Sequence, residues 1–233
     1  MLDLKWKQKK MIKQMIKNYI HRRPNLATKI IKFLSRVHTY SHHKIAELAS
    51  ILEGGKHPKH RITNYHQFFL SRVSGEDRIL DVGCGVGFLA YQISAKAKGV
   101  VGIDFSEPNI AYAKHHHQRS NLKFVFGDVT TYAFNESFDK IILSNVLEHI
   151  DDRVGLLKSL SRISDTILFR VPMENRDWLT VYKKEIGVEY RLDVTHRLEY
   201  RKEVVESEAA RAGWRVEEYE VQWGEFWAVL KRI

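Results

Sequence analysis

The stretch RILDVGCGVGFLA, residues 78–90, constrains the fold of this 233-residue chain more than any other. It opens with apolar residues, as in a buried strand, and glycines then follow at every second position: Gly83, Gly85 and Gly87. Glycines at the exit of a strand permit a tight turn and let another molecule approach bare backbone. The spacing G-x-G-x-G differs from the dinucleotide fingerprint G-x-G-x-x-G, and Asp81 stands two positions ahead of the turn. The sequence therefore predicts a strand–turn–helix unit whose turn meets a ligand.

Strand-like and helix-like segments alternate after this point. Strands are predicted at Arg78–Val82, Val100–Asp104, Leu122–Phe126, Asp139–Ser144 and Thr166–Val171. Helices are predicted at Phe88–Lys96, Glu107–Gln118, Arg153–Ile163 and Arg201–Ala212. This alternation indicates a parallel sheet covered on both faces. The final runs WRVEEYEVQW and EFWAVLKR are joined around Gly224, and so short a link makes them antiparallel. The predicted fold is an α/β, Rossmann-like doubly wound sheet, mostly parallel, with an antiparallel C-terminal hairpin.

Carboxylates follow two further predicted strands. Asp104 ends the second strand, about twenty residues after the glycine turn, where a carboxylate can accept from ribose hydroxyls. Gly127-Asp128-Val129 follows the third strand directly. Each aspartate alone could be a cap or a turn former, but the carboxyl ends of parallel strands meet at one sheet edge, where ligands of such folds bind. We therefore expect a ligand site at this edge.

On ILDVGCGVG, VVGIDFSEPNI, FVFGDV and FDKIILSNVLEHI, in that order, the chain resembles the class I S-adenosylmethionine-dependent methyltransferases from about Arg78 to its C-terminus. The resemblance implies a seven-stranded sheet with an antiparallel last strand, and S-adenosylmethionine as cofactor. It implies that the glycine turn lies against the amino-acid part of the cofactor, Asp104 binds the ribose, Phe105 flanks the adenine and Asp128 takes the adenine amine. The predicted cofactor residues are Asp81, Gly83, Gly85, Gly87, Asp104, Phe105, Asp128, Val129 and Ser144.

The methyl acceptor is expected to bind in the segment 171–200. Together with HPKHRITNYHQFFLSRV, this segment resembles bacterial small-molecule methyltransferases, including enzymes of glycan and secondary-metabolite clusters. A hydroxyl acceptor profits from a base of near-neutral pKa, which suits histidine. The candidates are His149, which follows the fourth strand, and His196 in the insert. The same pocket could be lined by Tyr182, Tyr190, Glu199 and Tyr200, or these could pack a lid.

A metal site is the alternative role for Glu148, His149 and His196. Some small-RNA 2′-O-methyltransferases carry an E-x-x-E-H pattern at this place, but here the first glutamate is Asn145. That departure removes a carboxylate that magnesium would want. The triplet His115-His116-His117 is not expected to share a metal, because consecutive helical residues point in different directions. We therefore predict no metal.

The first third of the chain is strongly basic. Residues 1–75 carry 16 Lys and Arg against three Asp and Glu, in a chain of formal net charge +10. Apolar residues recur there with helical spacing. Helices are predicted at residues 11–20, 26–37 and 43–52 and from about Thr63. We expect a basic helical extension over residues 1–75, followed by a cofactor-binding domain over residues 76–233.

This extension admits several roles. It could be a lid over the cofactor, closed by Arg61, Tyr65 and His66. It could also form a dimer surface, contact a membrane or an anionic acceptor, pack on its own domain, or simply be a solvated face. The single cysteine, Cys84, excludes an internal disulfide and a four-cysteine zinc site, and is interpreted as a small residue in a crowded loop. No window is apolar for long enough to span a bilayer and no signal-peptide pattern opens the chain, so a cytoplasmic protein is expected.

The expected reaction is methyl transfer from S-adenosylmethionine to an oxygen or nitrogen of a small metabolite, sugar or lipid-linked acceptor, with S-adenosylhomocysteine as product. RNA methylation that uses the basic region for affinity is the main alternative. A non-catalytic cofactor-binding module is the other, because fold does not imply activity. The intact glycine turn and both aspartates argue against that module.

Overall fold

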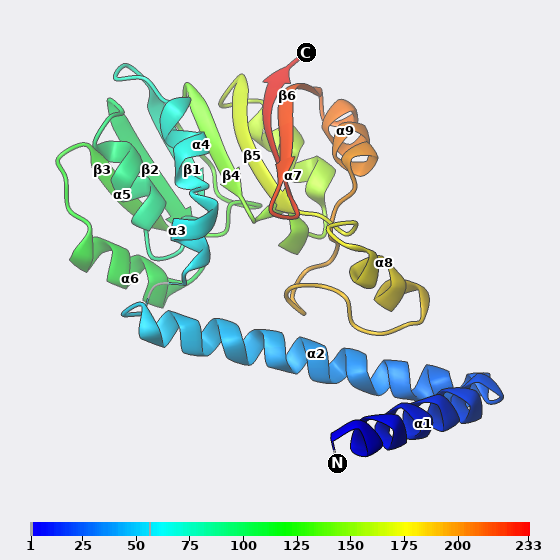
Figure 1. Ribbon diagram of the computed structural model, residues 1–233. Coiled ribbons are helices and arrows are strands. Elements are labelled where there is room, and N and C mark those ends of the chain that lie inside the picture. Colours follow the sequence, from blue (N-terminus) through cyan, green and yellow to red (C-terminus); the bar gives the residue numbers. More distant parts are fainter. Residues whose placement is uncertain (1, 56) are drawn as a thin grey trace. The chain divides into compact units, whose positions relative to one another are not determined.

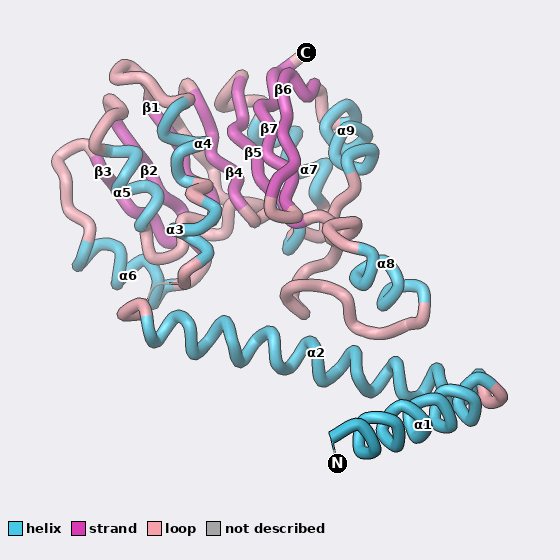
Figure 2. Tube along the Cα trace, in the orientation of Figure 1, coloured by secondary structure: helices cyan, strands magenta, loops and turns pink. Residues whose placement is uncertain are grey.

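The computed structural model describes residues 2–55 and 57–233. They form two compact units, drawn in Figure 1 and, by secondary structure, in Figure 2. The first unit comprises Met1–Pro58 and Tyr182–Tyr190, and the second comprises Lys59–Val181 and Arg191–Ile233. The boundary predicted between residues 75 and 76 therefore lies earlier, because Phe69 and its neighbours are buried in the core of the second unit.

The first unit is built on two helices, α1 (Leu2–His21) and α2 (Pro24–Leu52). Between them, the N–H of Arg23 donates to the carbonyl of Ile20 at 2.8 Å. The prediction of separate helices at 26–37 and 43–52 was wrong. No glycine or proline interrupts the stretch between them, and the Thr39 hydroxyl bonds the Ser35 carbonyl at 3.1 Å within one continuous helix. Lys183 also belongs to this unit and donates to Thr39 Oγ1 at 3.0 Å.

The second unit is a seven-stranded sheet with helices on both faces (Figure 1). Its strands are β1 (Arg78–Val82), β2 (Gly99–Asp104), β3 (Leu122–Phe126), β4 (Lys140–Ser144), β5 (Thr166–Pro172), β6 (Trp214–Gln222) and β7 (Glu225–Arg232). Its helices are α3 (Lys59–Thr63), α4 (His66–Ser71), α5 (Phe88–Ser94), α6 (Glu107–His116), the 3-10 turn η1 (Leu147–His149), α7 (Arg153–Leu160) and α9 (Lys202–Arg211). Helix α8 (Trp178–Glu185) runs from this unit into the first.

The strand order is β3-β2-β1-β4-β5-β7-β6. Strand β7 pairs antiparallel with both β5 and β6, and the other neighbouring strands pair in parallel. The predicted Rossmann-like, mostly parallel seven-stranded sheet is thus confirmed, and the predicted strands agree with the observed ones to within one residue. Strand β1 pairs with β2 on one side and with β4 on the other. The strand order therefore reverses at β1, and the topological switch point of the sheet is at the carboxyl end of this strand. Ligands of such sheets bind in the crevice at that point.

Alternate residues of the strands enter two cores, one on each face of the sheet. Leu80 of β1 packs in a cluster with Leu157 of α7 and Ala209 of α9. The preceding residue, Ile79, packs in the other cluster with Phe69 of α4 and with α5 and α6. This burial on both faces explains the continuous apolar runs of the parallel strands.

The helix predicted to begin at about Thr63 was wrong. Helix α3 ends at Thr63, and α4 begins at His66. Asn64 lies between them with φ 47°, in the left-handed region that asparagine tolerates better than most residues. The predicted helix therefore begins three residues later than expected, as α4, and Asn64 separates it from α3, which was not predicted.

Candidate functional site

The glycine turn joins β1 to α5, and its three glycines have different surroundings. All have positive φ: 65° at Gly83, 54° at Gly85 and 79° at Gly87. A Cβ on Gly87 would lie 2.6 Å from the ring of Phe124, and one on Gly83 would lie 2.5 Å from Val146 Cγ2. A Cβ on Gly85 would meet no atom of the described chain within 4 Å. Gly83 and Gly87 therefore serve close packing, whereas Gly85 leaves open space beside its backbone.

Asp104, the last residue of β2, holds this turn in place. Its Oδ2 accepts from the N–H of Gly85 at 2.9 Å, and its Oδ1 accepts from the N–H of Ser106 at 2.8 Å. A carboxylate offers about four acceptor positions, so roughly two remain after these bonds. Asp104 can therefore bind two further donors, such as a pair of neighbouring hydroxyls, without releasing the turn.

A cavity of about 880 Å³ lies at this edge of the sheet. Of the nine predicted cofactor residues, the cavity is lined by Gly83, Asp104, Phe105, Asp128 and Val129. Its lining does not include Asp81, Gly85, Gly87 or Ser144. The exposed Asp128 is held in place because its Oδ1 accepts from the backbone N–H and the hydroxyl of Thr130, at 2.9 and 2.7 Å. Phe105 is 77% exposed, which leaves its ring face available to a flat ligand.

Asp81 and Ser144 occupy the carboxyl halves of neighbouring strands. Asp81 is buried, and burial, followed by the nearby charge of Asp104, raises its pKa to about 7. Its Oδ2 has no hydrogen-bond partner among the described residues. A buried carboxyl oxygen without a partner is costly in a protein and suits a site that a ligand donor completes. The hydroxyl of Ser144 accepts from Arg170 Nη1 at 3.3 Å instead.

Both predicted catalytic histidines lie at the same edge of the sheet, but only one of them lines the cavity. His149, in η1, lines the cavity, whereas the buried His196 lies outside the lining. Their ring centroids are 4.7 Å apart in an edge-to-face arrangement. Burial, and then the neighbouring His196, lower the pKa of His149 below its ordinary value. His196 Nδ1 lies 3.2 Å from Oε1 of the fully buried Glu199.

A short polar chain sets the tautomer of His149. The Thr195 hydroxyl donates to Asp193 Oδ1 at 2.8 Å, and bonds from Thr195 hold the pKa of Asp193 below its usual range. Thr195 Oγ1 also lies 3.1 Å from Nδ1 of His149. Because the hydroxyl proton points to the aspartate, Oγ1 accepts from Nδ1–H of the imidazole. The lone pair of neutral His149 is then at Nε2.

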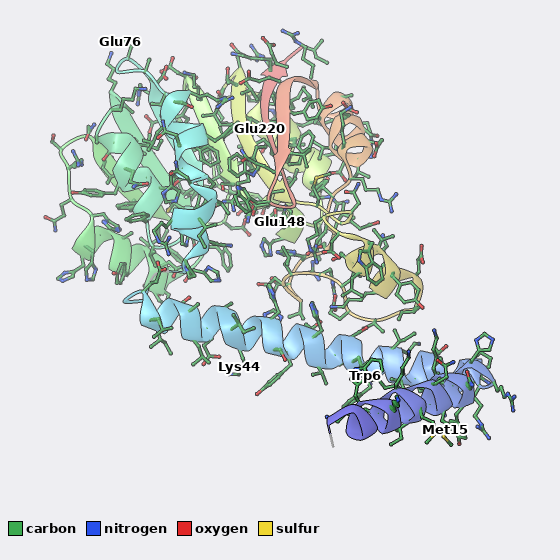
Figure 3. All side chains as sticks on the ribbon, viewed as in Figure 1. Trp6, Met15, Lys44, Glu76, Glu148 and Glu220 are labelled. Atoms are coloured by element: carbon green, nitrogen blue, oxygen red, sulfur yellow. The ribbon has the colours of Figure 1, made fainter. Side chains whose placement is uncertain are left out.

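Glu148 is a fully buried acid beside these histidines, and Figure 3 labels it at the lower edge of the sheet. Burial raises its pKa to about 8, and neither of its carboxyl oxygens has a partner in the described part of the chain. Glu148, His149 and His196 each place one ligand-type atom within 4.8 Å of the others. One carboxylate and two imidazoles suit zinc or iron better than magnesium. The prediction of no bound metal stays a prediction.

The sequence reading missed a buried ion pair at this edge. Arg170 of β5 donates to both carboxyl oxygens of Glu225 at 2.6 Å, and its guanidinium lies 3.8 Å from the ring centroid of Tyr65. Burial, and then the charge of Arg170, lower the pKa of Lys59. A charged residue inside the apolar run TILFRVP was the available signal, because a buried charge is rare unless it is paired.

The lining of the cavity includes none of the other residues predicted for the acceptor pocket. Tyr182 and Tyr190 belong to the first unit. Glu199 pairs with Arg176, and the buried hydroxyl of Tyr200 donates to Glu208 Oε2 at 3.0 Å. Of the residues predicted to close over the cofactor, His66 and Tyr65 are buried and Arg61 is exposed. Cys84 is buried, and burial raises the pKa of its thiol, which disfavours a nucleophilic role.

Part of the chain is similar to known methyltransferases. A family model described as a methyltransferase domain matches residues 80–165. A ubiquinone biosynthesis O-methyltransferase from Rhodopseudomonas palustris (strain BisA53) is 34% identical over 116 residues, 48% of this chain and 46% of the relative. Another from Bradyrhizobium diazoefficiens is 34% identical over 118 residues, 49% of this chain and 47% of the relative. The chain thus spans about half the length of the curated relatives it matches.

Solved structures share the fold. A magnesium protoporphyrin IX methyltransferase from Synechocystis PCC 6803, solved with bound SAH, matches with a TM-score of 0.59 and 17% identity, covering 74% of this chain and 82% of that one. The N-methyltransferase NodS from Bradyrhizobium japonicum WM9, in complex with S-adenosyl-L-homocysteine, matches with a TM-score of 0.55 and 16% identity, covering 74% and 85%. At such identities the likeness is one of fold.

Proposed function

We propose that this chain, whose residues 80–165 form a methyltransferase domain of the class I S-adenosylmethionine-dependent superfamily, transfers a methyl group to an oxygen of a small acceptor molecule. One observation carries the proposal: a single cavity is lined both by Asp104, with spare acceptor positions, and by the imidazole of His149. A cofactor ribose and an acceptor hydroxyl would each find a matching group there.

Five features at this edge of the sheet fit S-adenosylmethionine. Asp104 can accept from both ribose hydroxyls while it holds the turn. The exposed ring of Phe105 offers a face to adenine, and Asp128 offers an acceptor to the adenine amine. The open space at Gly85 and the unpaired Oδ2 of Asp81 suit the amino-acid part of the cofactor. When bound, S-adenosylmethionine supplies a sulfonium-activated methyl group.

His149 acts as the base in this proposal. Its lowered pKa keeps the imidazole neutral near pH 7, and its Nε2 takes the proton of the acceptor hydroxyl as the oxygen attacks the methyl carbon. The carbon–sulfur bond breaks as the carbon–oxygen bond forms, and S-adenosylhomocysteine leaves. Thr195 and His196 hold the ring of His149 and are positioning residues. Alignment of the two reactants can supply roughly 7–11 kcal/mol of the barrier.

The acceptor class follows from the relatives and from the size of the cavity. The relatives are named ubiquinone biosynthesis O-methyltransferases, which supports an oxygen acceptor on a small or lipid-linked molecule. A cavity of about 880 Å³ is of the size that holds small ligands. We therefore place a small metabolite or lipid-linked acceptor ahead of a sugar or a nitrogen acceptor.

The experiment that tests this function is a labelled transfer. The purified chain is incubated with methyl-labelled S-adenosylmethionine and an extract of the encoding organism, which is then separated into lipid, small-molecule, protein and RNA fractions. Label in the lipid or small-molecule fraction is expected. No label in any fraction, with intact S-adenosylhomocysteine binding by calorimetry, would identify the non-catalytic module instead.

Variants separate binding from chemistry. Asp104→Ala should weaken S-adenosylhomocysteine binding at least tenfold, because hydrogen bonds to a charged group contribute about 1.5–3 kcal/mol each. His149→Gln should lower turnover with the affinity for S-adenosylhomocysteine unchanged. His196→Ala should lower turnover more than cofactor affinity. Equal losses of affinity and turnover in both histidine variants would remove them from the reaction.

RNA methylation is a second candidate, favoured by one observation. Glu148, His149 and His196 converge in a way that could hold a divalent ion. Residues 1–75 could supply sequence-independent affinity for phosphates. Label in the RNA fraction, lost on treatment with a chelator and restored by added zinc, would favour this candidate over the small acceptor.

A further inference from the structure

Helices α1 and α2 leave large apolar side chains uncovered. On α1, Trp6 is 60% exposed and Met15 is 63% exposed; both are labelled in Figure 3. The exposed apolar side chains of α1 are Trp6, Met11, Ile12, Met15, Ile16 and Tyr19, and those of α2 are Phe33, Leu34, Val37, Tyr40, Ile45, Leu48, Ile51 and Leu52. Monomers rarely expose apolar patches on this scale, and such patches mark interaction surfaces.

Most of these apolar residues form one stripe along each helix. Trp6 is the exception, because it lies on the lysine side of α1, with Lys10 Nζ 5.2 Å from its ring centroid. On α2, Ile30, Leu34, Val37, Ile45 and Leu48 recur at spacings of three, four and eight residues, which keeps them on one face. At 1.5 Å per residue, the 20 residues of α1 extend about 30 Å and the 29 residues of α2 about 44 Å. The two stripes are therefore long, narrow and apolar, which suits a flat or an elongated partner.

Positive charge accompanies these stripes. Residues 1–58 contain 13 Lys and Arg against three Asp and Glu. On α1, Lys10, Lys13 and Lys17 recur at spacings of three and four residues, on the side of the helix away from Met11 and Met15. Amphipathic helices with a lysine-rich polar face and Trp, Phe or Leu opposite lie in the interface of a bilayer.

The charge distinguishes between the possible partners. A second copy of the chain would bring a second strongly positive unit against the first, and like charges oppose association. An anionic bilayer attracts the same charges by about 1 kcal/mol for each Lys or Arg near the surface. RNA would need the charge but not the exposed apolar stripe. None of the described helices has the length and hydropathy to cross a bilayer, so contact would be at its surface.

We propose that the helical unit of α1 and α2 docks on the surface of an anionic lipid bilayer, with its apolar stripes in the interface and its lysines and arginines at the anionic headgroups. The proposal is independent of the methyl acceptor. It concerns the first unit by itself, and it would hold for a chain that methylates a water-soluble molecule. It assigns a role to the part of the chain that the matched methyltransferase domain does not include.

The test is co-sedimentation of the full chain with two kinds of vesicle. One is phosphatidylcholine alone, and the other contains a third phosphatidylglycerol. The chain should bind the anionic vesicles and release as salt is raised. The triple variant Lys10→Glu, Lys13→Glu, Lys17→Glu should lose about a hundredfold in vesicle affinity. The matched control is a triple variant on exposed residues of the second unit: Lys123→Glu, Lys158→Glu, Arg162→Glu. It changes the net charge by the same amount and should bind vesicles as the unchanged chain does.

A local measurement checks that the apolar stripe enters the interface. The emission of a tryptophan placed in the stripe by Met15→Trp, obtained as the difference between this variant and the unchanged chain, should shift to shorter wavelength with anionic vesicles only. Circular dichroism of each variant checks that the helices remain. No vesicle binding, or equal loss in the matched control, overturns the proposal. So does self-association that is abolished by Met15→Gln without vesicle binding, or binding of mixed-sequence RNA without vesicle binding.

Discussion

Substituting Gly87 by alanine should destabilise the fold by two separable effects. Its φ of 79° lies in the left-handed region, where an L side chain costs roughly 1–2 kcal/mol. The added Cβ would also lie 2.6 Å from the Phe124 ring and 2.9 Å from Ala113 Cβ. Such overpacking of a core costs typically about 1–3 kcal/mol. Gly87→Ala should therefore lower the free energy of unfolding by about 2–5 kcal/mol.

Gly213 provides the matched control. Its φ of 82° is close to that of Gly87, but a Cβ there would meet no described atom within 4 Å. Gly213→Ala should therefore cost only the backbone strain, roughly 1–2 kcal/mol. Gly85 has φ 54° and equally open space, so Gly85→Ala should lower the free energy of unfolding by the same amount as Gly213→Ala. Unlike Gly213→Ala, Gly85→Ala should also weaken cofactor binding, because the proposed function puts the amino-acid part of the cofactor beside its backbone.

Urea unfolding followed by circular dichroism gives the three free energies, and calorimetry with S-adenosylhomocysteine gives the three affinities. The expected pattern is a large stability loss only for Gly87→Ala and an affinity loss of tenfold or more for Gly85→Ala. Equal stability losses for Gly87→Ala and Gly213→Ala would refute the packing argument. Unchanged affinity in Gly85→Ala would refute its place beside the ligand.

Three further predictions concern the polar interior. Because burial raises the pKa of Glu148 to about 8, the folded state binds its proton more tightly than the unfolded state, and the free energy of unfolding should fall as pH rises from about 5 to 8. Glu148→Gln should flatten that fall in urea titrations, whereas the exposed Glu76→Gln should not. Glu225→Gln leaves the buried Arg170 without its carboxylate partner and should lower the free energy of unfolding by about 3–5 kcal/mol in the same titration. The control Asp165→Asn, at the exposed pair with Arg232, should lower it by less than about 1 kcal/mol. Thr195→Val removes the acceptor at His149 Nδ1, so kcat should fall with KM for the cofactor unchanged and the pH profile displaced; an unaltered profile would mean that the hydroxyl does not set the tautomer.

The sheet could be predicted because its signals are local. The central parallel strands β1, β4 and β5 are largely buried on both faces, so they appear in the sequence as apolar runs. A glycine or an acid marks the end of β1, β2 and β3. Asp104 and Asp128 could be placed at one edge from topology alone, because parallel strands end together. Their exact partners could not be predicted: the bond from Gly85 N–H to Asp104 depends on the fold of the turn.

The helices of the N-terminal region were harder to predict, because the spacing of their apolar residues is irregular. Between Val37 and His43 the apolar spacing fades, yet no residue there stops a helix, and α2 continues through it. Similarly, the helix predicted from about Thr63 begins only at His66, because Asn64 adopts the left-handed conformation. Periodicity reports which face is apolar, whereas helix ends depend on backbone conformation that single residues adopt in context.

The relation between the two histidines shows where sequence reasoning reaches its limit. Each could be assigned to the ligand edge, His149 by its strand and His196 by its insert, and the sequence slightly favoured His196 as the base. Which of the two histidines lines the cavity depends on a contact between distant segments: the N–H of Arg197 donates to the carbonyl of Glu148 at 2.7 Å. That bond fixes the insert against η1, so that His149 lines the cavity and His196 lies buried against it. The roles proposed for the two histidines therefore differ because of a backbone hydrogen bond, which no residue pattern in either segment encodes.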